Sequence, residues 1–316
     1  MSLNFAVIGV GGYIAPRHLR AIRDTGNCLV AAVDPKDSVG VLDQFAFDVR
    51  FFTEIERFDR HLEKLRRGPA EGRVHYVSVL SPNYLHDAHC RLALRAGAEV
   101  ICEKPLVIKP WNLDLLAALE AETGRKIFTV LQLRLHPDLI ALRQDLLSRP
   151  ADRKHDVDLT YITSRGAWYH VSWKGITEKS GGIAVNIGIH FFDLLMWLFG
   201  GVQEVSLFHN DPLRMAGFLE LERARVRWFL SVDPGDLPYP PVPGKKSTFR
   251  SIIVDGKEVE FSEGFTDLHT RVYEETLSGR GFSAADARPS IELTHLISTT
   301  GLSAPGDLAH PYLQRR

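Results

Sequence analysis

Polar side chains interrupt the apolar stretch "SGGIAVNIGIHFFDLLMWLFG", which covers residues 180–200. Asn186, His190 and Asp193 follow one another at spacings of four and three residues, so on a helix their side chains lie along one stripe. Buried polar groups must be paired or must line a cavity. The stripe therefore predicts either a hydrogen-bonded core network or one wall of a ligand site.

A charged pair follows an apolar strand in "AEVICEKPLVIKP", where residues 99–102 run directly into Glu103 and Lys104. Ligands of open parallel sheets bind beyond the carboxyl ends of the strands, so we expect this pair to face a cofactor crevice. An ammonium partly removed from water has a lowered pKa and can hydrogen-bond a hydroxyl that loses its proton. An ion pair between Glu103 and Lys104 is the structural alternative.

The stretch "VIGVGGYIAPRHLRAI" places Gly9 and Gly11 between a strand and a helix. Glycines there allow a tight turn and the close approach of a pyrophosphate to the helix N-terminus. Ile14 stands where the third glycine of GxGxxG is expected. Asp34, at the end of the next strand, can accept hydrogen bonds from ribose hydroxyls and repel the extra phosphate of NADP, which favours NAD. A bare turn, with Asp34 as a turn former before Pro35, is the alternative.

Two further polar stretches also follow expected strands. In "SPNYLHDAH", Ser81 and Asn83 can cap the next helix, and His86 is expected in its first turn near the nicotinamide. In "QLRLHP", Gln132 and Arg134 are expected beside the nicotinamide and the substrate, or else as hydrogen-bonding residues at a strand edge.

The elements that must position these residues change in rhythm along the chain. Strands are expected at 5–10, 28–34, 74–80 and 99–105, with helices at 13–24, 85–96 and 111–123. This alternation predicts an α/β, doubly wound parallel sheet of Rossmann type in residues 1–124. Residues 125–316 are expected to form an α+β domain on a large open, mostly antiparallel sheet. Its strands are expected in meander order within 156–169, 202–210, 217–232 and 249–261, with a hairpin turn at Asp255-Gly256 and a rigid proline-rich loop at 233–244.

Composition limits the class of protein. The chain has 316 residues, of which 45% are hydrophobic and 24% charged, and these values are typical of a soluble two-domain protein. Its net charge of −1 gives no reason to expect nucleic acid or a membrane as a partner. The three cysteines have no metal-ligand or CxxC spacing, so reduced thiols and no metal are expected. We expect neither a secretory signal nor a membrane span, and hence a cytoplasmic protein.

The ordered motifs "GVGGYIA", "SPNYLHDAH", "EKP", "QLRLHP" and "SGGIAVNIGIHFFD" resemble the glucose–fructose oxidoreductase, inositol dehydrogenase and MocA family. The resemblance implies a nicotinamide cofactor, oxidation of a sugar-ring hydroxyl, and Lys104 and His190 as catalytic residues. Many members carry aspartate four residues before that histidine, whereas this chain has Asn186. We therefore assign Asn186 to hydrogen bonding of the substrate and leave Lys104 or His190 as the base. The expected cofactor contacts are Gly9, Gly11, Gly12, Tyr13, Ile14, Asp34, Ser38, Ser81, Asn83, His86, Glu103, Lys104 and Gln132.

Segments such as "VDPKDSVG" and "SRGAWYHVSWKG" are similar to the WlbA/WbpB branch of that family, which also has asparagine at this position. The similarity implies NAD-dependent oxidation of the C3 hydroxyl of UDP-N-acetylglucosaminuronic acid. Such a substrate carries a diphosphate and a carboxylate and needs cations and donors around it. The expected substrate contacts are Lys104, Arg134, Arg165, Tyr169, Asn186 and His190, with Lys174 and Ser180 also available.

The branch resemblance further implies a 3-keto product that an aminotransferase consumes in making O-antigen of lipopolysaccharide. Some members reoxidise retained NADH with 2-oxoglutarate, and the family's open sheets commonly pack into tetramers, so a homotetramer is expected. Two alternatives stay open. One is a sugar or polyol dehydrogenase acting on inositol or a free hexose, and the other is a catalytically inactive NAD-binding regulator.

Overall fold

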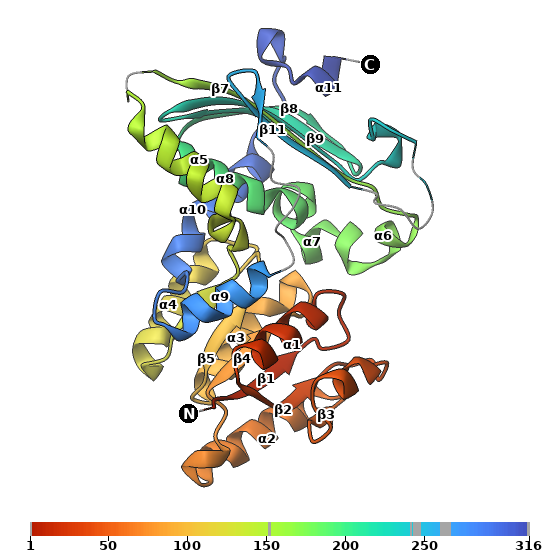
Figure 1. The fold of residues 1–316 in the computed structure, drawn as a ribbon. Coiled ribbons are helices and arrows are strands. Elements are labelled where there is room, and N and C mark those ends of the chain that lie inside the picture. Colours follow the sequence, from red (N-terminus) through yellow and green to blue (C-terminus); the bar gives the residue numbers. More distant parts are fainter. Residues whose placement is uncertain (1, 151–152, 241, 243–247, 260–266, 315–316) are drawn as a thin grey trace. The chain divides into compact units, whose positions relative to one another are not determined.

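The structure is a computed structural model that describes residues 2–150, 153–240, 242, 248–259 and 267–314. The chain divides into two compact units (Figure 1). The first unit combines Met1–Leu135 with Thr266–Arg288, and the second combines His136–Phe265 with Pro289–Arg316. The expected division after residue 124 differs from this one, because residues 125–135 complete the first sheet and a late segment returns to it.

The first unit contains a six-stranded parallel sheet in the order β3-β2-β1-β4-β5-β6, as expected of a Rossmann domain. Its strands are short, and the central ones are buried on both faces, as their nearly continuous apolar sequence predicts. They are β1 (Asn4–Ile8), β2 (Cys28–Val33), β3 (Arg50–Phe52), β4 (Tyr76–Val79), β5 (Glu99–Cys102) and β6 (Ile127–Thr129).

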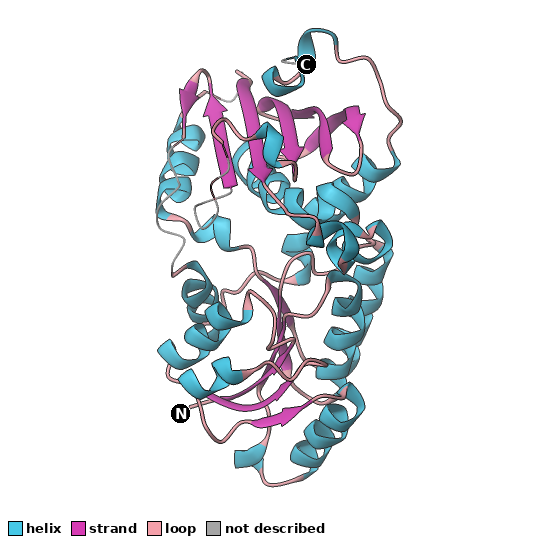
Figure 2. Cartoon of the chain, turned by 90° about the vertical axis from the view of Figure 1, so that its right-hand side faces the viewer, coloured by secondary structure: helices cyan, strands magenta, loops and turns pink. Residues whose placement is uncertain are grey.

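Helices cover both sides of this sheet (Figure 2). The late segment contributes α9, which packs beside α1 (Figure 1). The helix expected at 111–123 is confirmed, and the other two helices begin one or two residues later than expected. The helices are α1 (Ala15–Asp24), α2 (Ile55–Arg67), α3 (His86–Arg95), α4 (Trp111–Thr123) and α9 (Leu268–Leu277), with short 3-10 turns η1 (Gly40–Gln44), η2 (Ala70–Gly72), η3 (Asn83–Leu85) and η4 (Gln132–Leu135).

The second unit is built on a six-stranded mixed sheet in the order β12-β11-β7-β10-β9-β8. The expectation of simple meander order is wrong for β7, which lies between β11 and β10 and not beside β8. It pairs with β10 in parallel, while the other neighbours are antiparallel. The Asp255-Gly256 hairpin turn is confirmed, with φ of 50° and 78°. The strands are β7 (His155–Thr163), β8 (Val202–Asn210), β9 (Arg214–Leu221), β10 (Ala224–Ser231), β11 (Thr248–Val254) and β12 (Lys257–Glu258).

One face of this sheet is covered by the apolar helix α8 (Figure 1), whose Phe192 ring packs edge-on against Trp228 of β10. Residues 177–199 are apolar and long enough to cross a membrane, but 72% of the apolar window is buried in the structure, as in the core helix of a globular domain. The helices of this unit are α5 (Pro137–Ser148), α6 (Trp168–Val171), α7 (Thr177–Ser180), α8 (Ile189–Phe199) and α11 (Pro311–Gln314), with short turns η5 (Trp173–Gly175), η7 (Pro234–Asp236) and η8 (Gly306–Leu308). Helix α10 (Ala284–Thr299) runs through the division between the units.

The opposite face of this sheet is mixed in character. Its apolar part, which includes Ile162 and Phe229, packs against Tyr312 and Leu313 of α11. Its other part carries ion pairs between β7 and β10, such as Arg227 with Asp158. The chain's own C-terminal helix therefore covers some of the apolar surface that we expected a neighbouring subunit to cover.

Candidate active site

The glycine turn after β1 has the geometry of a phosphate cradle. Gly9 has φ of +90°, and a Cβ placed there would lie 2.8 Å from the backbone of Leu80. A Cβ on Gly11 would lie 3.1 Å from the Asp34 carboxyl carbon, and one on Gly12 would lie 3.1 Å from the Gly9 carbonyl oxygen. The turn therefore favours glycine, because the protein's own backbone and the Asp34 carboxylate leave little space for a side chain. Ile14, in place of the third glycine, packs into the core of this unit.

Asp34 is held against this turn. Its Oδ2 accepts a hydrogen bond of 2.9 Å from the Gly11 N–H, and its Oδ1 accepts one of 2.9 Å from the Lys36 N–H. The aspartate thus organises the turn before Pro35, as the structural alternative expects. The side chains of Tyr13 and Ser38 are exposed close by in sequence.

The polar residues after β4 are more buried than the sequence indicates. His86 is 1% exposed, and its two ring nitrogens each lie 2.7 Å from a backbone carbonyl oxygen, those of Ser81 and Pro105. Burial lowers the pKa of His86, although both hydrogen bonds act in the opposite direction. Because both ring nitrogens contact the protein's own backbone, His86 connects the loops after β4 and β5. The expectation that His86 contacts the nicotinamide is therefore not supported.

Ser81 and Asn83 do not occupy the N-cap position of α3. Leu85 is the N-cap residue of that helix, which has no side-chain capping bond. The Ser81 hydroxyl hydrogen-bonds His89 Nδ1 at 2.8 Å, and Asn83 is buried at the start of η3. Both residues follow β4 at the carboxyl end of the sheet, where a cofactor is expected.

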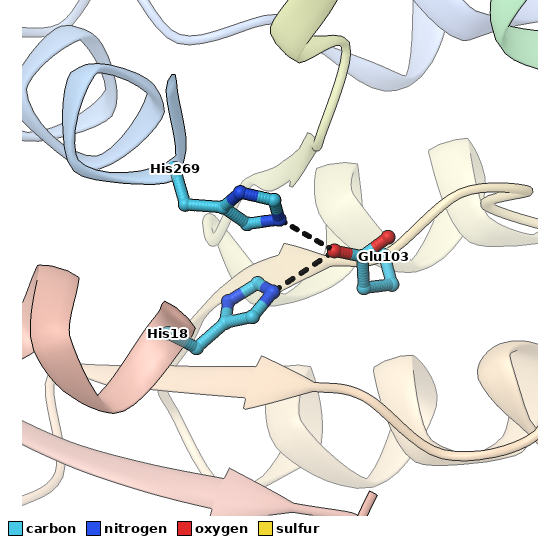
Figure 3. A group of neighbouring side chains, drawn as sticks. All are labelled: His18, Glu103 and His269. Carbon is cyan, nitrogen blue, oxygen red and sulfur yellow. Dashed lines mark hydrogen bonds and ion pairs between the residues drawn. The ribbon is translucent and has the colours of Figure 1, made fainter. Parts of the chain in front are cut away.

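Glu103 takes part in a buried network (Figure 3). Its Oε1 accepts hydrogen bonds from His18 Nε2 at 2.9 Å and from His269 Nε2 at 3.1 Å, and its Oε2 accepts one from the Lys104 N–H at 3.2 Å. Burial acts to raise the pKa of Glu103, but the bonds from the two histidines outweigh it and hold that pKa well below its usual range. We expected Glu103 to contact the cofactor, and the structure instead gives its carboxylate three donors from the protein.

The residues that sequence reasoning missed are the partners of this carboxylate. His18 lies on the buried side of α1, and His269 comes from α9, far away in sequence. The amphipathic pattern around His18 shows that it faces the core, but nothing in the sequence indicates that residue 269 meets it.

Lys104 lies half-buried immediately after this carboxylate, at the carboxyl end of β5 as expected. Gln132 and Arg134 follow β6 in η4 and belong to the first unit. The Oε1 of Gln132 is buried and has no hydrogen-bond partner in the described part of the chain. Arg134 donates to the Asp286 carbonyl oxygen at 3.2 Å and lies over the Phe282 ring, so the late segment holds its guanidinium.

A second polar group lies in the second unit. The Asn186 side-chain amide donates a 3.0 Å hydrogen bond to the Tyr169 phenol, which is 2% exposed. Lys174 Nζ lies 5.5 Å and 5.4 Å from the ring centroids of Trp168 and Trp173. Burial lowers the pKa of Lys174, and the nearby Arg165 charge lowers it further. Arg165 Nε is buried without a hydrogen-bond partner among the described residues.

Two neighbouring cations in a partly buried setting are unfavourable unless an anion joins them. Arg165 and Lys174 therefore form a candidate anion site next to the Tyr169–Asn186 pair. Tyr169 itself lies in the short helix α6, because β7 ends at Thr163 and not at residue 169 as expected.

The helix that carries Asn186 and His190 is not continuous. Gly181 and Gly182, with φ of +84° and +78°, follow α7, and residues 184–188 form a π-helical turn before α8. Short π segments interrupt α-helices frequently at functional sites. Asn186 and His190 are half-buried, whereas Asp193 is 2% exposed and lies in the core. The expected polar stripe of Asn186, His190 and Asp193 therefore includes one residue, Asp193, that is buried in the core.

We expected Ser180 to be available for contact with the substrate, but its hydroxyl is hydrogen-bonded to the backbone of α7 and the following turn. It is fully buried, its hydroxyl donates to the Ile176 carbonyl oxygen at 3.0 Å, and it accepts a bond from the Gly182 N–H at 3.1 Å. These bonds stabilise the end of α7, where the chain turns through the left-handed region.

Two family models match the chain in the order of its two units. The NAD-binding Rossmann fold of the oxidoreductase family matches residues 3–131, and the C-terminal alpha/beta domain of the same family matches residues 153–230. This chain belongs to the Gfo/Idh/MocA oxidoreductase family. The first unit is accordingly an NAD-binding Rossmann domain, and the glycine cradle and Asp34 fit that cofactor.

Solved structures of Gfo/Idh/MocA proteins include a close relative. The WlbA (WbpB) dehydrogenase from Thermus thermophilus is 52% identical, with a TM-score of 0.92 over 98% of this chain and 99% of that chain. It has been solved with NAD and UDP-GlcNAcA and with NAD and alpha-ketoglutarate. The WlbA dehydrogenase from Bordetella pertussis, at 20% identity and a TM-score of 0.74 over 94% of both chains, shares the fold.

Among curated proteins, a putative UDP-kanosamine synthase oxidoreductase subunit from Amycolatopsis mediterranei is 30% identical over 202 residues, which are 63% of this chain and 52% of that protein. A D-glucoside 3-dehydrogenase from Escherichia coli is 32% identical over 130 residues, which are 39% of this chain and 35% of that protein. These alignments span about half or less of each curated relative.

Proposed function

We propose that this chain is an NAD-dependent dehydrogenase that oxidises the C3 hydroxyl of UDP-N-acetylglucosaminuronic acid (UDP-GlcNAcA) to the 3-keto sugar. The observation that carries the proposal is the 52% identity, over nearly the whole of both chains, to the Thermus enzyme solved with NAD and UDP-GlcNAcA. Arg165 and Lys174, the cationic pair of the second unit, and the Tyr169–Asn186 pair supply the groups that such a substrate needs.

The cofactor is held by the first unit. The turn at Gly9, Gly11 and Gly12 is proposed to bind the pyrophosphate, and Asp34 is proposed to accept hydrogen bonds from ribose hydroxyls and to repel the additional phosphate of NADP. Gln132, with its buried unpaired Oε1, lies in the loop after β6 and is proposed to contact the nicotinamide end. When bound, NAD supplies the acceptor for the C3 hydride.

Two residues act at the substrate alcohol. In the proposed reaction Lys104, after β5, and His190, in α8, bind the C3 hydroxyl, and one of them takes its proton as the C–H bond breaks. Asn186 stands where an aspartate occurs in many relatives, and an amide cannot accept that proton. We therefore assign Asn186, oriented by Tyr169, to hydrogen bonding of the sugar.

The anionic parts of the substrate are assigned to the second unit. Arg165 and Lys174 share a partly buried setting with two indole rings, and a carboxylate or phosphate placed there neutralises their mutual repulsion. The same pair can bind a dicarboxylate. We therefore propose that 2-oxoglutarate, bound through this pair, takes the hydride of NADH and a proton at its keto group, giving 2-hydroxyglutarate and NAD; the Thermus structure with NAD and alpha-ketoglutarate supports this proposal.

The biological setting belongs to the same proposal. A 3-keto uronic acid linked to UDP is a substrate for transamination, which fits a role in making lipopolysaccharide O-antigen in the cytoplasm. A homotetramer built through the open sheet is proposed, with α11 covering part of the same face in each subunit.

The decisive assay compares substrates at fixed NAD concentration by the appearance of NADH absorbance. We expect turnover with UDP-GlcNAcA, and much less with UDP-N-acetylglucosamine, which lacks the carboxylate. Turnover of inositol or free glucose with no inhibition by UDP would instead identify a free-sugar or polyol dehydrogenase. Binding of NAD without turnover of any of these sugars would favour the inactive regulator.

A further inference from the structure

We propose that His18, Glu103 and His269 form a positioning network that fixes Lys104 for the reaction, and that this network is completed by the returning segment of the chain (Figure 3). The inference rests on the role proposed above for Lys104. None of the three residues is assigned to substrate, so their proposed role is to act through Lys104.

The hydrogen bonds define where the protons lie. An ionised carboxylate only accepts, so the His18 and His269 Nε2 atoms that contact Glu103 Oε1 both carry hydrogen. His18 Nδ1 is then an acceptor, and the Tyr273 hydroxyl, 2.8 Å away, donates to it. The Tyr273 oxygen in turn accepts from the Ser78 hydroxyl at 2.6 Å. Each contact in this series has one donor and one acceptor.

Because the residues of the network are buried, their polar atoms need hydrogen-bond partners within the protein. Both histidines, Tyr273 and Ser78 are at most 2% exposed, and Glu103 is 8% exposed. A buried carboxylate is costly unless it is hydrogen-bonded, and Glu103 has three donors. Burial lowers the pKa of His18, with the charges of His269 and Arg17 acting in the same direction and the hydrogen bond and charge of Glu103 opposing them.

The backbone around Lys104 is held on both sides, on one side by Glu103 of the network and on the other by His86, which lies outside the network. On one side, Glu103 Oε2 accepts from the Lys104 N–H at 3.2 Å. On the other side, the Pro105 carbonyl oxygen lies 2.7 Å from Nδ1 of the buried His86. Holding the backbone at both ends fixes the point from which the Lys104 side chain extends, and a displacement of about 1 Å at a catalytic group can cost ~10²-fold in rate.

Two histidines and a carboxylate are also common metal ligands, and their ligand atoms here lie within 4.8 Å of one another. However, the nitrogen–oxygen separations of 2.9 Å and 3.1 Å are hydrogen-bond lengths, which require a proton on each nitrogen. A bound metal would need both nitrogens deprotonated. The geometry therefore favours a hydrogen-bonded network, and stoichiometric metal in the purified protein would contradict it.

The test uses two variants at increasing distance from Lys104 and one matched control. Glu103→Gln removes the charge next to Lys104, and Tyr273→Phe removes only the hydroxyl that orients His18. His155→Asn is the control, because His155 is a buried histidine paired with a carboxylate, Asp255, in the other unit. We expect kcat to fall ~10²-fold in Glu103→Gln and by a smaller factor in Tyr273→Phe, with KM and the Kd for NAD near wild-type values. The control should keep its kcat.

A readout that needs no substrate separates this inference from the proposed function. Lysines are reductively methylated with ¹³C, and the Lys104 methyl signal is identified by its loss in Lys104→Met. We expect its position and line width to change in Glu103→Gln and Tyr273→Phe, and not in His155→Asn. Should Glu103→Gln fail to fold, Tyr273→Phe carries the test. An unchanged Lys104 signal and unchanged kcat in the folded variants would overturn the network's role, whatever the substrate proves to be.

Discussion

The Tyr169 phenol accepts a 3.0 Å hydrogen bond from the Asn186 side-chain amide, and the two residues come from different helices of the second unit. The bond fixes which way the amide of Asn186 faces. This orientation is compatible with the proposed role of Asn186 in hydrogen bonding of the substrate.

Removing this amide should weaken substrate binding and not cofactor binding. A buried polar group left without its partner costs about 1–3 kcal/mol, so Asn186→Ala is expected to lower kcat/KM for UDP-GlcNAcA by roughly 10- to 100-fold. Tyr169→Phe, which removes only the acceptor, should show a smaller loss. The measurement is steady-state kinetics together with NAD titration. A normal kcat/KM in Asn186→Ala would remove this residue from the substrate site.

Lys104 should be needed for turnover and not for NAD binding. Positioned acid–base groups contribute ~10² to 10⁴ in rate, and Lys104→Met is expected to lose a factor in that range while its Kd for NAD stays close to that of wild type. The control is Lys109→Met, because Lys109 is exposed five residues further along. Wild-type turnover in Lys104→Met would reject the assignment.

The cationic pair should recognise the sugar carboxylate or the diphosphate. Hydrogen bonds to charged groups contribute about 1.5–3 kcal/mol, so Arg165→Ala and Lys174→Met are each expected to raise KM for UDP-GlcNAcA by ~10- to 100-fold. If the carboxylate is the bound group, KM for UDP-N-acetylglucosamine should change little. An exposed lysine of β12, Lys257, provides the control variant Lys257→Met. Equal KM values for all three variants would place the anion elsewhere.

The glycine cradle offers a matched pair of substitutions. Gly9 and Gly26 both have positive φ, of 90° and 75°, but an added Cβ meets the Leu80 backbone only at Gly9. Gly26→Ala should cost only the left-handed strain of about 1–2 kcal/mol and keep NAD binding. Gly9→Ala should in addition displace the turn and abolish NAD binding, measured by calorimetry on the folded protein. Equal NAD affinity in the two variants would show that the turn does not bind the cofactor.

Acid should destabilise the first unit through its buried histidines. Burial, helped by the charge of His86, lowers the pKa of His89 to about 4. The unfolded chain binds a proton near pH 6.5 and the folded one does not, so the free energy of unfolding should fall as the pH drops from about 6.5 to 4. In His89→Gln this decline should be smaller in urea titrations at several pH values. An identical slope in both proteins would contradict the assignment.

Sequence reasoning succeeded where the signal is local. The alternation of apolar strands and helices indicates a parallel sheet, and the strand ends place the glycine turn and Lys104 at its carboxyl edge, because parallel strands end at one edge. The Asp255-Gly256 turn was predictable because few residue pairs adopt its backbone. Each of these features depends on a few neighbouring residues.

The features that sequence reasoning missed depend on contacts between distant residues. The parallel pairing of β7 with β10 joins strands that are about 60 residues apart in the sequence, and no turn signal encodes it. The π turn at 184–188 has the same apolar composition as an α-helix. The partners of Glu103 come from positions 18 and 269, and only the folded chain shows that they meet.

The most direct test of the proposed reaction uses UDP-GlcNAcA that carries deuterium at C3. Incubation of the enzyme with this sugar and NAD is followed by mass analysis of the reduced cofactor and of the sugar product. Our account predicts that the deuterium appears in NADH and that the sugar becomes a 3-ketone. Unlabelled NADH, or a product oxidised at another carbon, would contradict it.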